Sequence, residues 1–141
     1  MKANTFLHII VVDDDEDDRY MIDSSFRQVQ WMDHIKILSS GESLFRHLDS
    51  LPDSNAFPSL ILLDYHMPRI GAEEILLRLK RQQAYANINV AVYSTEMSDT
   101  LRDRLLAMGA VDCYTKRWNA NGNRQLAEAL KTVAQQNIEV Q

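Results

Sequence analysis

The amino-acid sequence predicts an α/β fold in which a five-stranded parallel sheet, in the doubly wound order 2-1-3-4-5, carries helices on both faces. Three observations lead to this prediction. Short apolar runs recur along the 141 residues with little polar alternation, as in strands buried on both faces. Segments with helical spacing of apolar residues separate these runs. Polar clusters or turns follow each run, and such an alternation requires right-handed crossovers between parallel strands.

The expected elements follow one another along the chain. Strands are expected at residues 7–12, 35–38, 60–63, 90–93 and 111–114. Helices are expected around the apolar stripes at residues 21–29, 44–51, 75–79, 101–108 and 126–133. Two prolines and an Asp-Ser-Asn cluster make residues 51–58 a surface loop before the third strand. Because no linker or repeat divides the chain, residues 1–141 are expected to form a single domain.

The charge of the chain is unevenly distributed. The 20 acidic and 15 basic residues give a net charge of −5, but six acidic residues stand together at positions 13–18, and 14 acidic residues remain elsewhere. Without a basic face, nucleic-acid binding is not expected. The apolar run at residues 6–12 is too short to span a membrane and lacks a signal-peptide cleavage region. With a single cysteine, which cannot form an internal disulfide, we expect a cytoplasmic protein that binds no membrane.

Polar residues end the apolar strands at one edge of the predicted sheet. The first strand ends in Asp13 and Asp14, the third in Asp64, the fourth in Ser94 and the fifth in Lys116. The carboxyl ends of parallel strands share one edge, and the first and third strands are neighbours, so the three carboxylates should converge. Carboxylates this close repel one another unless a cation neutralises them. Mg²⁺ fits, because it binds one or two carboxylates, keeps several waters and accepts phosphate oxygens.

These groups have the chemistry of phosphoryl transfer. Asp64 is the expected nucleophile, because it follows the most apolar strand and precedes a Tyr-His-Met-Pro turn. Mg²⁺ and Lys116 would stabilise charge on the phosphoryl oxygens, and Ser94 would supply a hydroxyl. The alternation of strand residues favours Ser94 over Thr95 for that role.

Other conspicuous residues have structural interpretations. The acidic residues at positions 15–18 are expected to open a solvated helix, because negative charge in a first turn favours the helix dipole. Trp31 and Trp118 are expected to be surface or loop aromatics. Cys113 is expected to be a small buried core residue.

The order of these fragments resembles the receiver domain of two-component response regulators. The shared pattern consists of Ile-Ile-Val-Val-Asp-Asp-Asp at 9–15, Leu-Leu-Asp-Tyr-His-Met-Pro at 62–68, Ser-Thr at 94–95, and Gly-Ala at 109–110 before Thr-Lys at 115–116. The resemblance covers nearly the whole chain and implies a flavodoxin-like (βα)5 fold. It also implies a stand-alone receiver, because the residues after the lysine are used by one loop and the last helix. The segment before the third strand resembles single-domain regulators associated with phytochrome-type histidine kinases.

The resemblance implies a function for the strand-end residues. Asp64 would accept a phosphoryl group from a phosphohistidine on a sensor histidine kinase or a histidine phosphotransfer protein. Asp14, Asp64 and the backbone carbonyl of His66 would ligate Mg²⁺, and Asp13 would assist through water. The protein would catalyse only its own phosphorylation and dephosphorylation, so it is not expected to be an enzyme in the usual sense.

The resemblance also implies how the signal would be passed on. Lys116 would contact the phosphoryl oxygens, and Ser94 would move to hydrogen-bond them, which shifts an existing equilibrium in the face around the fourth and fifth strands. Output would pass through an unidentified downstream protein, and the same face could form a homodimer. His66, Thr95 and Glu96 lie at modulating positions, and we expect His66 and Glu96 to control the lifetime of the phosphorylated state.

Three positions depart from the family pattern. The pair Gly71-Ala72 stands where Asp/Asn-Gly is usual after the Met-Pro turn. Cys113 occupies the place of an aromatic switch residue, which leaves Tyr93 or Tyr114 to contribute. Arg117 follows the lysine in place of a proline with a cis bond. Because a cis bond before a non-proline residue costs roughly 3–4 kcal/mol, we expect a trans bond there.

Two alternative functions remain open from the sequence. A degenerate receiver would keep the fold and act as a phosphorylation-independent interaction module, which the three departures would favour. A Mg²⁺-dependent phosphohydrolase would also use Asp64, but it usually needs a second aspartate two residues later as acid and base, where this chain has His66. Of these hypotheses, these residues favour the phosphorylation-dependent switch.

Overall fold

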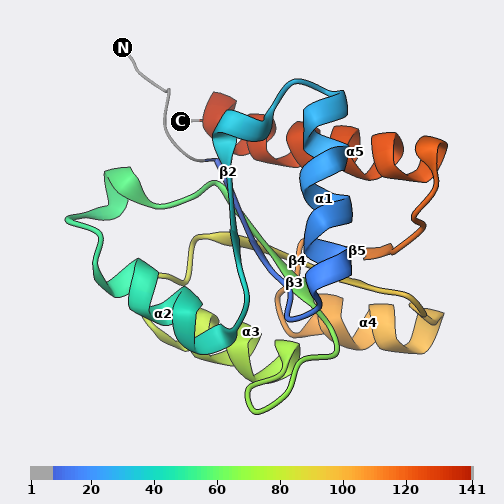
Figure 1. Cartoon of the computed structure of the whole chain (residues 1–141). Coiled ribbons are helices and arrows are strands. Elements are labelled where there is room, and N and C mark those ends of the chain that lie inside the picture. The colour runs from blue at the N-terminus through green and yellow to red at the C-terminus, as the bar shows by residue number, and fades with distance from the viewer. Residues whose placement is uncertain (1–7, 141) are drawn as a thin grey trace.

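The computed structural model describes residues 8–140 and has the expected α/β architecture (Figure 1). Its parallel strands lie in the order β2-β1-β3-β4-β5, which confirms the predicted fold class. The strands are β1 (Ile9–Val12), β2 (Ile35–Leu38), β3 (Leu60–Asp64), β4 (Asn89–Ser94) and β5 (Asp112–Thr115). The helices are α1 (Glu16–Gln28), α2 (Gly41–Asp49), α3 (Ala72–Arg81), α4 (Asp99–Ala107) and α5 (Ala120–Val140), with short 3₁₀ turns η1 (Met32–His34) and η2 (Ser54–Ala56).

Two apolar layers hold the sheet between its helices. Alternate residues of β1 and β3 face opposite sides: Ile10 and Ile61 pack with α2, α3 and α4, whereas Ile9 and Leu60 pack with α1 and α5. Every apolar residue of β1 and β3 has an exposed fraction of 0%. This burial on both faces explains why these strands read as continuous apolar runs. By contrast, β2 lies at the edge of the sheet and is only half-buried.

The predicted boundaries are shifted in places. Residue 7, where the first strand was expected to begin, lies outside the described residues. The helix expected over 44–51 ends at Asp49, because Leu51 precedes Pro52 and the residue before a proline is disfavoured in the helical region. The expected surface loop follows, with η2 inside it. Trp31, expected to be a surface or loop aromatic, lies in the loop between α1 and η1, but only 8% of it is exposed, so it is not a surface residue.

Two loops at the carboxyl edge of the sheet contain positions that depart from the receiver-domain pattern. Within residues 8–140 no peptide bond is cis, so the bond between Lys116 and Arg117 is trans, as expected. In the loop before α3 the residue in the left-handed region is Arg69, with φ of 64°, whereas Gly71 has φ of −85° and open space around it. The backbone therefore does not require glycine at position 71. Among residues 8–140, no helix has the length and apolar character of a membrane-spanning segment.

Candidate phosphoryl-transfer site

Three carboxylates meet where β1 and β3 end. Val12 and Leu63 are partners in the sheet, so Asp13 and Asp64 follow side by side. Carboxylate oxygens of Asp13, Asp14 and Asp64 all lie within 4.8 Å of one another. Asp13 is 0% and Asp64 4% exposed, whereas Asp14 is open to solvent. The structure thus brings together the three acids expected to converge, two of them buried and one at the mouth of the pocket.

Lys116 extends into the same pocket from the end of β5. Its Nζ lies 3.0 Å from Asp64 Oδ1 and 3.1 Å from Asp13 Oδ2, and its side chain is 4% exposed. The backbone N–H of Lys116 donates to the carbonyl of Ser94 at 2.8 Å, which continues the pairing of β4 and β5. A trans bond after the lysine is therefore compatible with an ammonium beside Asp64.

The electrostatics of the pocket favour an additional cation. Burial, followed by the nearby charge of Asp13, raises the pKa of Asp64 to about 7, although Lys116 opposes the shift. Burial lowers the pKa of Lys116, but hydrogen bonds to Asp18 and Asp64 outweigh it, so that pKa is raised overall. The ammonium thus stays charged, but it faces more carboxylates than it can neutralise. An oxygen-lined pocket with surplus negative charge suits a hard divalent ion.

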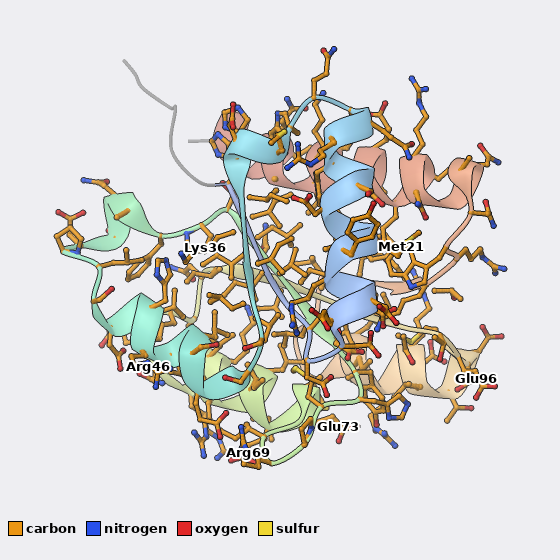
Figure 2. The ribbon with its side chains drawn as sticks, in the orientation of Figure 1. Met21, Lys36, Arg46, Arg69, Glu73 and Glu96 are labelled. Atoms are coloured by element: carbon orange, nitrogen blue, oxygen red, sulfur yellow. The ribbon has the colours of Figure 1, made fainter. Side chains whose placement is uncertain are left out.

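The remaining predicted residues lie at or just after the carboxyl ends of β3 and β4. Ser94 is 1% exposed, and its Oγ accepts the N–H of Glu96 at 3.3 Å. Thr95 and Glu96 are exposed, and Figure 2 labels Glu96 on the loop before α4. His66 is also exposed, and its ring meets that of Tyr65 edge-on, with centroids 4.9 Å apart. Ser94 is thus buried at the end of β4, whereas the three expected modulators are exposed.

Asp18 and Trp118 join the pocket, which the sequence interpretation missed. Asp18 Oδ2 lies 2.8 Å from Lys116 Nζ, and Asp18 Oδ1 accepts the indole N–H of Trp118 at 2.8 Å. Residues 15–18 open α1 as expected, but the expectation that Asp18 is a solvated residue was wrong. A usable signal was present: Ile22, four residues later on α1, is fully buried, and residues four apart share a helix face.

Tyr93 forms another part of the pocket. It is 0% exposed, and its hydroxyl donates to Asp13 Oδ2. The Lys116 ammonium lies 4.5 Å from the centre of its ring. Cys113 is buried in the layer with α2, α3 and α4, as expected, and Tyr114 packs half-buried on the opposite face. Tyr93 and Tyr114 were both considered as substitutes for an aromatic residue at position 113. Of the two, Tyr93 hydrogen-bonds to an acid of the pocket, Asp13.

A second polar network lies on the α3 and α4 side of Asp64. The hydroxyl of Tyr65, the residue after Asp64, donates to Glu73 Oε2 at 2.7 Å. Arg104 of α4 donates to the same carboxylate oxygen at 2.6 Å and to the Tyr65 hydroxyl at 3.0 Å. Figure 2 labels Glu73, which lies in the first turn of α3. The network therefore joins the loop after Asp64 to α4.

Comparisons with known proteins agree on one family. The model of the response regulator receiver domain family matches residues 9–135. The two-component response regulator ORR5 of Oryza sativa subsp. japonica is 31% identical over 109 residues, which cover 77% of each chain. The receiver domain of a DNA-binding response regulator from Colwellia psychrerythraea has a TM-score of 0.73 at 23% identity, covering 92% of this chain and 98% of that one. The Mn²⁺-bound form of the response regulator Rcp1 has a TM-score of 0.71 at 21% identity, covering 92% and 93%.

The family match spans all the strands and loops that form the acidic pocket. Receiver domains are signalling proteins of two-component systems rather than conventional enzymes, bind Mg²⁺ at an acidic pocket, and interact with histidine kinases or phosphotransfer proteins. The pocket at the carboxyl edge of this sheet has the corresponding acids. With a family match over most of its length and a relative above 30% identity, the chain belongs to the response regulator receiver domain family.

Proposed function

We propose that the chain is a phosphorylation-dependent switch in which Asp64 accepts a phosphoryl group from the phosphohistidine of a histidine kinase or phosphotransfer protein. The carrying observation is the environment of Asp64: it is 4% exposed, and its Oδ1 lies 3.0 Å from the Lys116 ammonium. It also lies within 4.8 Å of carboxylate oxygens of Asp13 and Asp14. A nucleophilic carboxylate, a fixed cation and further oxygen ligands are what phosphoryl transfer to aspartate needs.

The residues of the pocket fit Mg²⁺. Asp14 and Asp64, with the backbone carbonyl of His66, would hold the ion directly, and Asp13 would hold it through water. The surplus of buried carboxylates over the single ammonium supports this assignment, because such a set is stabilised by a hard cation. When bound, Mg²⁺ supplies positive charge to the phosphoryl oxygens in the transition state. The Mn²⁺ described for Rcp1 is consistent with a divalent ion in this fold.

The protein residues have separate roles in the proposed transfer. A carboxylate oxygen of Asp64 forms the bond to phosphorus, while the bond from phosphorus to the donor histidine breaks and its electron pair stays on the imidazole nitrogen. Lys116 donates hydrogen bonds to the phosphoryl oxygens. The Ser94 hydroxyl, buried at the end of β4, donates to the same group once it forms. That new contact would shift the face around β4 and β5 and pass the signal to a downstream protein.

The rim residues are proposed to set how long the phosphoryl group persists. His66 and Glu96 are exposed and flank the pocket on the loops after β3 and β4. In this proposal both contact water that approaches the phosphorylated Asp64. Replacing both, as His66→Ala with Glu96→Ala, should change the dephosphorylation rate several-fold. An unchanged rate would refute this role.

The direct test uses a small phosphodonor. Incubation with phosphoramidate and Mg²⁺ should add the mass of one phosphoryl group, located at Asp64 by peptide mass spectrometry. The addition should be lost in Asp64→Asn and in EDTA, but kept in Asp17→Asn, which removes an equal charge from an exposed position. No metal-dependent change would instead support a degenerate interaction module. Sustained release of phosphate over many turnovers would support a phosphohydrolase.

A further inference from the structure

The Lys116 ammonium is surrounded by three carboxylates, and they fall into two groups. Asp13 and Asp64 lie 3.1 and 3.0 Å from Nζ, and both belong to the carboxylate cluster proposed to hold Mg²⁺. Asp18 lies at 2.8 Å but does not belong to that cluster. An ammonium has three N–H donors, so these partners can use all of them. When a metal ion and a phosphoryl group engage Asp13 and Asp64, Asp18 is the partner that still holds the lysine.

Asp18 is itself held on two sides. Its backbone N–H donates to Asp15 Oδ1 at 3.0 Å, which fixes it in the first turn of α1, where the helix dipole favours a negative charge. Its second carboxylate oxygen, Oδ1, accepts the indole N–H of Trp118 at 2.8 Å. The Trp118 ring packs edge-on against Tyr93, with centroids 6.2 Å apart. These contacts, from Tyr93 to Trp118 and from Trp118 to Asp18, therefore connect the sheet, the loop after β5 and α1.

Such a constraint matters for a lysine more than for a shorter side chain. The Lys116 stem is long and flexible, and fixing its rotamers costs conformational entropy. The strand pairing of β5 positions only the backbone of Lys116, through its bond to Ser94. Its side chain is therefore positioned by the groups around the ammonium. A cation already in place when charge develops stabilises a transition state better than one that must be ordered during the reaction.

From this geometry we infer that Asp18 is a positioning residue, which holds the Lys116 ammonium beside Asp64, and that Trp118 in turn holds Asp18. This inference rests on the proposed phosphorylation of Asp64. It gives one member of the acidic run a task distinct from metal binding: Asp18 acts on the lysine and does not touch the phosphoryl group.

The test compares variants at Asp18 with a matched control. Asp17→Asn makes the same change of charge in the same turn of α1, at an exposed position. With saturating Mg²⁺ and phosphoramidate, Asp18→Asn should lower the limiting phosphorylation rate constant about tenfold, and Asp17→Asn less than about twofold. Asp18→Glu, which keeps the carboxylate, should regain most of the rate. Trp118→Phe, which removes the indole donor but keeps an aromatic ring, should give an intermediate rate.

A second measurement separates positioning from general damage. Asp18→Asn should shift the NMR resonances of the Lys116 ammonium and of the Trp118 indole N–H, whereas Asp17→Asn should leave both in place. The half-saturating Mg²⁺ concentrations of the two variants should agree within about twofold, because both lose one nearby charge. Urea unfolding of both variants checks that the fold is retained.

The outcomes distinguish the inference from the proposed function. If the wild type is phosphorylated at Asp64 and Asp18→Asn matches Asp17→Asn in rate and spectrum, the positioning role is wrong and the proposed function remains. If the wild type takes up no phosphoryl group, the proposed function is wrong, and a shift of the Lys116 resonance in Asp18→Asn alone still supports the hold on the ammonium. A slow Asp18→Asn that Asp18→Glu does not rescue would overturn the role of the carboxylate.

Discussion

Two ion-pair networks flank Asp64, and they differ chiefly in burial. On the α1 side the ammonium of Lys116, with a side chain only 4% exposed, meets carboxylates of Asp13, Asp18 and Asp64. On the α3 and α4 side Arg104, 54% exposed, meets Glu73, 37% exposed. The shortest contacts are similar, at 2.8 Å for Lys116 and 2.6 Å for Arg104.

Although the contact distances are similar, breaking the two networks should have different effects on stability. Removing one partner of a buried pair leaves an uncompensated charge away from water, which is strongly destabilising. Breaking an exposed pair changes little, because water screens the charges and each side chain regains its rotamers. The buried network can hold a charged group in one place. The exposed network can open and close at small cost, which suits a contact between the loop after Asp64 and α4.

The largest expected effect comes from breaking the buried network at its centre. Lys116→Met should lower the free energy of unfolding by roughly 3–5 kcal/mol in EDTA, because three carboxylates then lose their buried cation. Arg104→Met, the same change on the exposed side, should leave the urea midpoint almost unchanged. Urea unfolding followed by far-ultraviolet circular dichroism measures both.

The stability of the same two variants can also be compared with and without Mg²⁺. Added Mg²⁺ should restore part of the lost stability in Lys116→Met, because an ion that binds only the folded state stabilises it. It should affect Arg104→Met no more than the wild type. Equal losses in the two variants, or a larger loss in Arg104→Met, would overturn the contrast between the networks.

The two networks also show what sequence reasoning could and could not reach. Asp13, Asp14 and Asp64 were placed together correctly because parallel strands end at one edge, and that rule needs only strand order. The fold was predictable for a similar reason, since burial on both faces makes β1 and β3 apolar at every position before the aspartates.

What could not be predicted depends on how loops fold back onto the sheet. Asp18 meets Lys116 across 98 residues and Trp118 across 100. The spacing from Asp18 to Ile22 places Asp18 on the buried face of α1, but it does not specify which distant residues Asp18 approaches. Asp18 was instead interpreted from its acidic neighbours, although the buried face of α1 begins with it. The burial of Trp31 in its loop was not predicted for a related reason: it stacks on His8 and Phe26, and these contacts depend on the path after α1.

A smaller effect is expected from removing one tyrosine hydroxyl in each network. Tyr93→Phe removes one of the two donors at the fully buried Asp13 Oδ2 and leaves it only the Lys116 ammonium, which should cost about 1–3 kcal/mol of unfolding free energy. Tyr65→Phe removes the matching hydroxyl beside Glu73, where water can replace it, and should cost clearly less. Urea unfolding in EDTA compares them, and a Tyr65→Phe loss as large as that of Tyr93→Phe would contradict the prediction.

The smallest expected effect concerns the pH dependence of the exposed network. The hydrogen bond from Tyr65, and then that from Arg104, hold the pKa of Glu73 below its usual 4.5. A carboxyl group whose pKa is lowered in the folded state stabilises the fold above its unfolded pKa, and loses that contribution as the pH falls through the folded value. Glu73→Gln should therefore lower the urea midpoint by about 0.2 M or less at pH 7, after allowance for solvent screening.

As the pH falls through the folded pKa of Glu73, the midpoints of Glu73→Gln and the wild type should converge, because Glu73 becomes protonated in both states. A double-mutant cycle with Arg104→Gln at pH 7 isolates the contribution of the pair, which added salt should reduce. A midpoint difference that persists at low pH would assign the effect to packing of the Glu73 side chain. A coupling as strong as that of the Lys116 network would show that the exposed network is a rigid part of the pocket and not the movable contact inferred from its exposure.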